Sequence, residues 1–118
     1  MSSPQLPNYL RTHRKRACLS QEEVAFLLGS TSDARISRHE RSAQTPNLRT
    51  LLGYELLFRT PIRELYGGVA SEVDESLRGR ARRLLGKLAR LRPCALSARK
   101  IETLLAFLRS APPGNEER

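Results

Sequence analysis

Residues 20–29 contain the signals of a short helix with a defined start and a defined end. Ser20 stands three residues before Glu23, the spacing of a capping box, in which the hydroxyl accepts from a free backbone N–H and the carboxylate bonds back to the serine amide. A helical apolar pattern follows at Val24, Ala25, Leu27 and Leu28. Gly29 then ends the helix, because glycine readily adopts the left-handed conformation found at helix ends. Short helices are marginal in water, so this segment must pack against others.

Further short helices are predicted on both sides of this one. A preceding helix is expected at Asn8–Ala17. After Gly29, the residues Ser30–Ser32 form a polar turn in which one hydroxyl can cap the next helix. That helix is expected at Asp33–Ser42, with Ile36 facing inward.

Two more helices complete a predicted unit of five. Asn47 caps the fourth, whose inward positions are predicted to be Leu48, Leu51, Leu52, Leu56 and Leu57. Thr60 and Pro61 open a fifth helix that continues to Leu65, because proline suits the first helical position. Gly67 and Gly68 are expected to close the unit. We therefore predict an all-α fold with one five-helix domain at residues 8–68.

Two longer helices are predicted after this domain, in a region at residues 69–111. They span Val69–Arg92 and Ser97–Ser110, and Pro93 separates them. Apolar residues in the first of them recur at alternating steps of four and three, which is a heptad pattern. We expect this surface either to pack on the last helix of the same chain or to form a homodimer through Leu77, Leu84, Leu88, Leu91, Leu104, Leu105 and Leu108. Arginines and lysines accompany the pattern from Arg78 to Arg92, as a solvated face or as extra contacts to DNA backbone. Residues 1–7 and 112–118 are predicted to be disordered.

Charge favours an anionic partner, while several other classes of function are disfavoured. The chain has 21 Lys and Arg against 12 Asp and Glu, a formal net charge of +9. With three Phe, three Tyr and no Trp, it offers few platforms for stacking single-stranded bases. No apolar run approaches the roughly 18 residues of a membrane span, and the first residues lack the apolar region of a signal peptide. We expect a cytoplasmic protein, associated with the nucleoid when it is bound to DNA.

Neither a metal site nor an enzyme active site is predicted. Cys18 and Cys94 lie far apart without the spacing of metal ligands, and we expect them to be small, buried or half-buried residues. His13 and His39 have no cysteine or carboxylate at ligand spacing, which favours structural or surface roles. No set of nucleophile, base and orienting group is visible, and no glycine-rich phosphate loop. We expect no cofactor.

Three segments of the chain together resemble a known family. LRTHRKRACLSQEEVAFLLG, then ISRHER, then TPNLRTLLGYELLFRTPIRELY are similar, in this order, to the XRE family of lambda-repressor-like and Cro-like regulators, over about half of the chain. The resemblance implies a helix-turn-helix domain in which the second helix crosses the DNA backbone and the third enters the major groove. It implies a transcriptional repressor that binds double-stranded DNA as a dimer, on a near-palindromic operator.

The same resemblance implies roles for individual residues. Gln21 would contact a phosphate, and Arg14 and Glu40 would form a partly buried ion pair. The outward face of the third helix would contact bases, and its strongest candidate is Arg38, because a guanidinium can bond guanine O6 and N7 together. The base-contact set is Asp33, Ala34, Ser37 and Arg38, and further phosphate contacts are expected at Ser32, Arg35, Arg41, Asn47 and Arg49.

The sequence departs from the family pattern in three places. The span from Gly29 to Ile36 is one residue longer, which changes the register of the residues that precede the third helix. Arg59 stands where a helix-ending glycine is common. Glu55 replaces a small apolar residue. If it is buried it needs a basic or hydroxyl partner, and otherwise a slight rotation of the helix leaves its carboxylate in contact with solvent.

Two other functions remain open at the level of sequence. In the first, the chain is an antitoxin whose C-terminal helices bind a partner toxin, while the helix-turn-helix regulates its own gene. In the second, the helix-turn-helix no longer binds DNA, which the basic face of the third helix argues against. Operator binding by the purified chain without a partner favours the regulator over the antitoxin.

Overall fold

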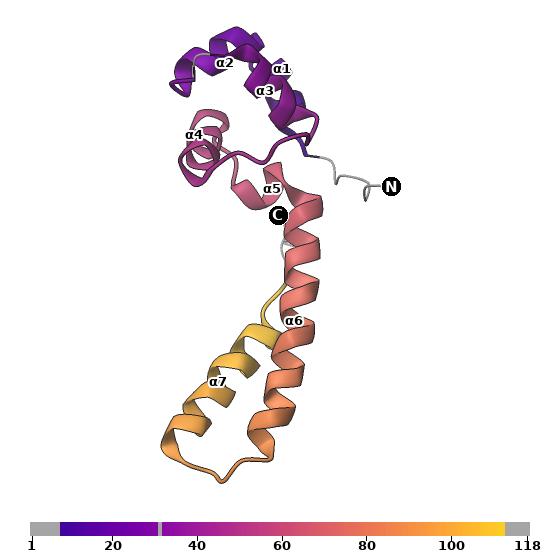
Figure 1. Cartoon of the computed structure of the whole chain (residues 1–118), viewed down its shortest axis with the longest axis vertical. Coiled ribbons are helices and arrows are strands. Elements are labelled where there is room, and N and C mark those ends of the chain that lie inside the picture. Colours follow the sequence, from indigo (N-terminus) through magenta and orange to yellow (C-terminus); the bar gives the residue numbers. More distant parts are fainter. Residues whose placement is uncertain (1–7, 31, 113–118) are drawn as a thin grey trace. The chain divides into compact units, whose positions relative to one another are not determined.

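The computed structural model describes residues 8–30 and 32–112, and within these residues all regular structure is helical (Figure 1). The predicted lead at residues 1–7, Thr31 of the predicted turn and residues 113–118 of the predicted tail lie outside the described residues. The chain divides into two compact units, Met1–Ala70 and Ser71–Arg118, called here the first and the second unit. The helices are α1 (Leu10–Arg16), α2 (Gln21–Leu27), α3 (Asp33–Glu40), α4 (Leu48–Phe58), α5 (Ile62–Leu65), α6 (Gly67–Ala89) and α7 (Ala95–Arg109).

The first unit is held together by a core to which each of its short helices contributes. None of α1 to α5 is long enough to be stable alone, so burial of apolar side chains must stabilise them. The largest wholly buried side chain is Tyr54, from the middle of α4. The core cluster comprises Leu10, Val24, Ala25, Ile36, Tyr54, Leu65 and Tyr66, with Leu19, Leu28, Leu51, Leu57 and Phe58 packed against it.

The caps that start and end these helices largely follow the sequence. The capping box of Ser20 and Glu23 is present, and Gly29 has the positive φ of 75° expected of a residue that follows a helix. Asn47 caps α4 by accepting from the Thr50 amide at 2.9 Å. The expected hydroxyl cap of α3 is wrong for Ser32, whose side chain makes no cap bond. Its amide instead donates to the hydroxyl of Ser30 at 3.3 Å, within the turn.

The predicted inward face of α4 is wrong in part. Leu48, Leu52 and Leu56 are 67%, 45% and 78% exposed, while Leu51 and Leu57 are half-buried. A step of four residues advances 40° around a helix, so these three leucines form one stripe on the side of the helix that faces away from Tyr54. The aromatic ring determines which stripe is buried, because it contributes the largest apolar area.

The glycine pair does not close the first unit. Gly67 and Gly68 are instead the first residues of α6, and the Ala70 amide donates to the Tyr66 carbonyl at 2.8 Å. Glycine is an unfavourable helix residue by about 1 kcal/mol relative to alanine, which a long helix tolerates at its end. None of the helices described here is both long and apolar enough to cross a membrane.

The second unit pairs the later part of α6 with α7, and Arg78 joins the two. Its guanidinium bonds Asp74 one turn earlier at 2.8 Å and donates to the carbonyls of Leu108 and Ser110 at 3.0 and 2.8 Å. It also lies 4.8 Å from the centre of the Phe107 ring. Arg78 therefore satisfies carbonyls at the end of α7 and does not belong to a solvated basic face. Both cysteines are exposed, against expectation, and Cys94 is the N-cap residue of α7.

The predicted heptad surface is only partly covered within the chain. Ala81 and Leu88 are buried, and Leu104 and Leu108 are half-buried. By contrast, Leu77, Leu84, Leu91 and Leu105 are 50%, 44%, 59% and 40% exposed. The second unit thus leaves Leu77 and Leu84 of α6, Leu91 just beyond it and Leu105 of α7 open to solvent, while Ala81 and Leu88 of α6 are buried.

Candidate nucleic-acid interface

The third helix has a buried face and a strongly basic exposed face. Ile36 and His39, on the inner face, are almost wholly buried. The exposed residues of the helix and its C-cap are Asp33, Ala34, Arg35, Arg38 and Arg41. The three arginines recur every third residue, so they lie along one side of a helix of little more than two turns. Ser37, the fourth predicted base-contact residue, is half-buried.

Neutral partners hold two of these arginines. Arg38 donates through Nε to the side-chain oxygen of Gln44 at 3.2 Å, and Arg41 donates through Nε to the Ser37 hydroxyl at 3.3 Å. Among the described residues, neither arginine forms an ion pair with a carboxylate. Their positive charge is therefore positioned but not neutralised, which is the arrangement that favours an anionic partner.

A polar cluster behind this face joins α1, α2 and α3. The structure places Arg14 against Glu40 in an ion pair whose side chains are 11% and 4% exposed. Arg14 also donates to the Leu19 carbonyl at 2.9 Å, and its bond to Glu40 raises the pKa of the guanidinium. Gln21 donates to the same carboxylate at 3.1 Å. Sequence reasoning did not place Gln21 in this cluster, because α2 and α3 come together only in the folded chain.

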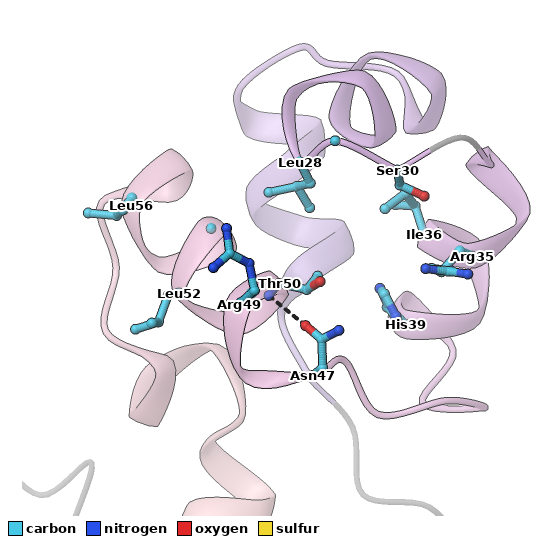
Figure 2. Close-up of a pocket in the computed structure, with 12 residues that line it drawn as sticks. Leu28, Ser30, Arg35, Ile36, His39, Asn47, Arg49, Thr50, Leu52 and Leu56 are labelled. Carbon is cyan, nitrogen blue, oxygen red and sulfur yellow. Dashed lines mark hydrogen bonds between the residues drawn. The ribbon is translucent and has the colours of Figure 1, made fainter.

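A cleft of about 500 Å³ lies between α3 and α4 and brings together three of the predicted phosphate-contact residues (Figure 2). Arg35 comes from α3, Arg49 from the first turn of α4, and Asn47 caps that turn. None of the described residues that line the cleft is an aspartate or a glutamate. Gln21, Ser32 and Arg41 do not line it. Anions at the cleft would meet a guanidinium group on either side and the N-terminus of α4, all of which favour negative charge.

His39 lines the deep side of the cleft and has a structural partner. It is 2% exposed, and its Nδ1 lies 2.9 Å from the hydroxyl of Tyr54, with the two rings edge to face. Burial, together with the charges of Arg35 and Arg38, lowers the pKa of His39, and burial raises the pKa of Tyr54. The signal in the sequence was its position three residues after Ile36, which places both on one helix face.

We expect the first unit to lose stability on acidification because of His39. The pKa of this histidine is lowered in the folded state, whereas in the unfolded chain it is about 6.5. Above that pH both states are neutral. As the pH falls through about 6.5 the unfolded chain gains a proton that the folded chain resists, so the free energy of unfolding decreases until the folded pKa is passed. Urea denaturation at several pH values between 7.5 and 5 measures this.

Two variants separate this effect from general acid sensitivity. His39→Gln should show a shallower loss of stability over that range than the unchanged chain, whatever its stability at pH 7.5. His13→Gln, at the half-buried histidine of α1, should keep the full slope. Equal slopes for all three proteins would contradict the role given to His39.

The structure explains two of the residues that depart from the pattern of the similar family, Glu55 in α4 and Arg59 at its C-cap. Glu55 is half-buried and accepts from the Ile62 amide at 3.0 Å, so it satisfies a free N–H at the start of α5. This backbone partner was not among the alternatives that the sequence suggested. Arg59 adopts the left-handed conformation at φ 51°, ending α4 where glycine is more common.

The predicted site residues thus fall into three places in the first unit. The outward face of α3 holds Arg38 and the other base-contact candidates, the cleft holds Arg35, Asn47 and Arg49, and the polar cluster holds Gln21 with the ion pair. The predicted dimerisation leucines all belong to the second unit. When the chain was compared with protein-family models, with curated proteins and with solved structures, no match was found.

Proposed function

We propose that this chain is a sequence-specific regulator that binds double-stranded DNA, with α2 and α3 as its helix-turn-helix, and that it acts as a repressor in the cytoplasm. The observation that supports this most is the row of Arg35, Arg38 and Arg41 on the exposed side of α3. The opposite side of the same helix is fixed by buried Ile36 and His39. A short, rigidly held helix with a basic outer face suits the major groove, which is wide enough to admit an α-helix.

In this proposal, contacts to bases and contacts to phosphates come from two neighbouring surfaces of the first unit. Arg38 contacts a guanine, because its bond to Gln44 uses Nε and orients the rest of the guanidinium. Arg35, Asn47 and Arg49 bind phosphates beside the cleft, and the N-terminus of α4 adds its free amides. The ion pair of Arg14 and Glu40 contacts no DNA; it fixes how α1 and α3 meet.

A salt titration with matched variants tests the phosphate contacts. Fluorescence anisotropy of a labelled duplex should show affinity falling linearly with salt on logarithmic axes, because each bound phosphate releases counterions. Arg49→Ala should weaken binding to all sequences and reduce the slope by about one. Arg16→Ala removes the same charge from an exposed position in α1 and serves as the control. Binding that does not depend on salt, or an equal effect of both variants, would count against the proposal.

In this proposal two copies of the chain form a homodimer through their second units. Leu77, Leu84 and Leu91 recur every seven residues and stay exposed, so a second copy that covered them would remove apolar surface from water. Sedimentation should show a dimer, and Leu84→Asp should raise its dissociation constant at least about tenfold, since a loss of about 1.4 kcal/mol is sufficient. Leu56→Asp is the control, because that leucine is exposed in the first unit. A monomer at micromolar concentration would contradict the dimer.

The same exposed leucines support a second candidate function. An antitoxin would cover them with a partner toxin and use the helix-turn-helix to regulate its own gene. This alternative predicts that the purified chain is a monomer and that it binds DNA tightly only together with that partner.

A further inference from the structure

The cleft between α3 and α4 is lined by more binding groups than a DNA phosphate would contact. A phosphate group can bond Arg35 or Arg49, but it is compact and hydrated and leaves apolar walls uncovered. Leu28 and Ile36 line the cleft together with Leu52 and Leu56. In Figure 2, Leu52 and Leu56 lie toward the left and Arg35 and His39 toward the right, so the cleft has an apolar end, with Arg49 beside it, and a polar end.

The apolar end is open to solvent. Leu52 and Leu56 are 45% and 78% exposed, and both belong to the stripe on α4 that does not enter the core. Covering such apolar side chains removes them from water, which is favourable. A ligand with an apolar body would gain from these side chains as well as from the cations.

The polar end offers hydrogen-bond donors. His39 Nδ1 and the Tyr54 hydroxyl lie 2.9 Å apart, and the tautomer of the histidine determines which of the two donates. The amide hydrogens of Asn47 and the guanidinium of Arg35 are donors at this end, and the described residues that line the cleft include no carboxylate.

We propose that this cleft binds a small organic anion with an apolar body, the anionic group meeting Arg49 and the body covering Leu52 and Leu56 beside it. The volume of about 500 Å³ lies within the range of small-molecule sites, roughly 300–1,000 Å³. Because Arg49 also contacts a phosphate in the proposed function, ligand and DNA exclude one another. That second part of the inference rests on the proposed function, whereas binding of the anion does not.

Binding is tested with 8-anilinonaphthalene-1-sulfonate, which combines a sulfonate with a fluorescent apolar body. Its fluorescence should rise with one saturable site in the first unit. Arg49→Ala and Leu56→Ser should each weaken that site at least about fivefold, and circular dichroism checks that both variants remain folded. Arg16→Ala and Leu27→Ser change the same residue types at exposed positions away from the cleft and should leave the affinity of the site within about twofold.

Two comparisons decide the outcome. N-phenyl-1-naphthylamine has the same body without the anionic group, so it should bind at least about fivefold more weakly; equal binding would overturn the anionic ligand. Equal affinity of the unchanged chain and of the Arg49→Ala and Leu56→Ser variants would overturn the site. For a chain that binds duplex DNA, the sulfonate probe at ten times its dissociation constant should reduce DNA affinity at least about fivefold, and no reduction would overturn the competition. A chain that binds the probe but no DNA would refute the proposed function and leave the ligand site standing.

Discussion

Glu40→Leu should lower the free energy of unfolding of the first unit by about 3–5 kcal/mol, the largest effect that we expect from one substitution outside the apolar core. The carboxylate of Glu40 is 4% exposed and accepts from both Arg14 and Gln21. Removing it leaves the guanidinium of Arg14 buried without its counterion. Denaturation by guanidinium chloride, followed by circular dichroism, measures the loss.

Two further variants show whether the stranded charge is the cause. The double variant Arg14→Met with Glu40→Leu should recover a large part of the loss, because replacing a whole buried pair by apolar residues is often neutral or better. Glu22→Leu removes an exposed carboxylate of α2 and should change stability by less than about 0.5 kcal/mol. If the double variant were no more stable than Glu40→Leu alone, the electrostatic explanation would be wrong.

The second large effect concerns the choice between DNA sequences. Arg38→Ala should reduce discrimination between the preferred site and a scrambled duplex by about 1–3 kcal/mol, or roughly 5- to 150-fold. The physical reason is that a guanidinium bonded to guanine O6 and N7 distinguishes that base, whereas contacts to phosphate do not. Competition anisotropy with the two duplexes measures the ratio of affinities.

Arg41→Ala is the matched control for this experiment. Arg41 lies on the same side of α3 and is also held by a neutral partner, but it is proposed to contact phosphate. Its loss should weaken both duplexes alike and leave their ratio unchanged. If Arg38→Ala also weakened both duplexes equally, the base contact would have to be assigned to another residue.

Features of the fold that depend on neighbouring residues were predictable from the sequence. The capping box of Ser20 and Glu23, the ending at Gly29 and the cap at Asn47 each involve residues no more than about two turns apart. Their physics is local, because a side chain satisfies a free N–H or carbonyl within its own segment. The existence and order of the helices follow from such signals together with apolar spacing.

Features that depend on contact between distant segments were not predictable. Nothing near Tyr54 in the sequence indicates that it would reach His39, and this pair determines which side of α4 enters the core. Likewise Arg78 was grouped with its basic neighbours, whereas the end of α7, thirty residues later, supplies its partners. Leucine at helical spacing on α4 and α6 showed that apolar stripes exist but not which stripe the fold would bury.

The candidate site likewise has features that follow from neighbouring residues and features that depend on contact between distant segments. That α3 has a basic outer face follows from the spacing of Arg35, Arg38 and Arg41 alone. The cleft could not be foreseen, because it forms where Arg35 of one helix and Arg49 of the next come to line the same space. Its apolar end arises from the misassigned leucines of α4, and the ligand proposal therefore depends on the structure.

Selection from a pool of random duplexes with the purified chain tests the central claim, sequence-specific binding of DNA, most directly. We predict enrichment of a near-palindromic sequence with two half-sites centred about one helical turn apart, since a two-fold symmetric dimer would place its two α3 helices on equivalent half-sites. Recovered duplexes that share no sequence would contradict the claim, and so would a pool that is not retained at low salt.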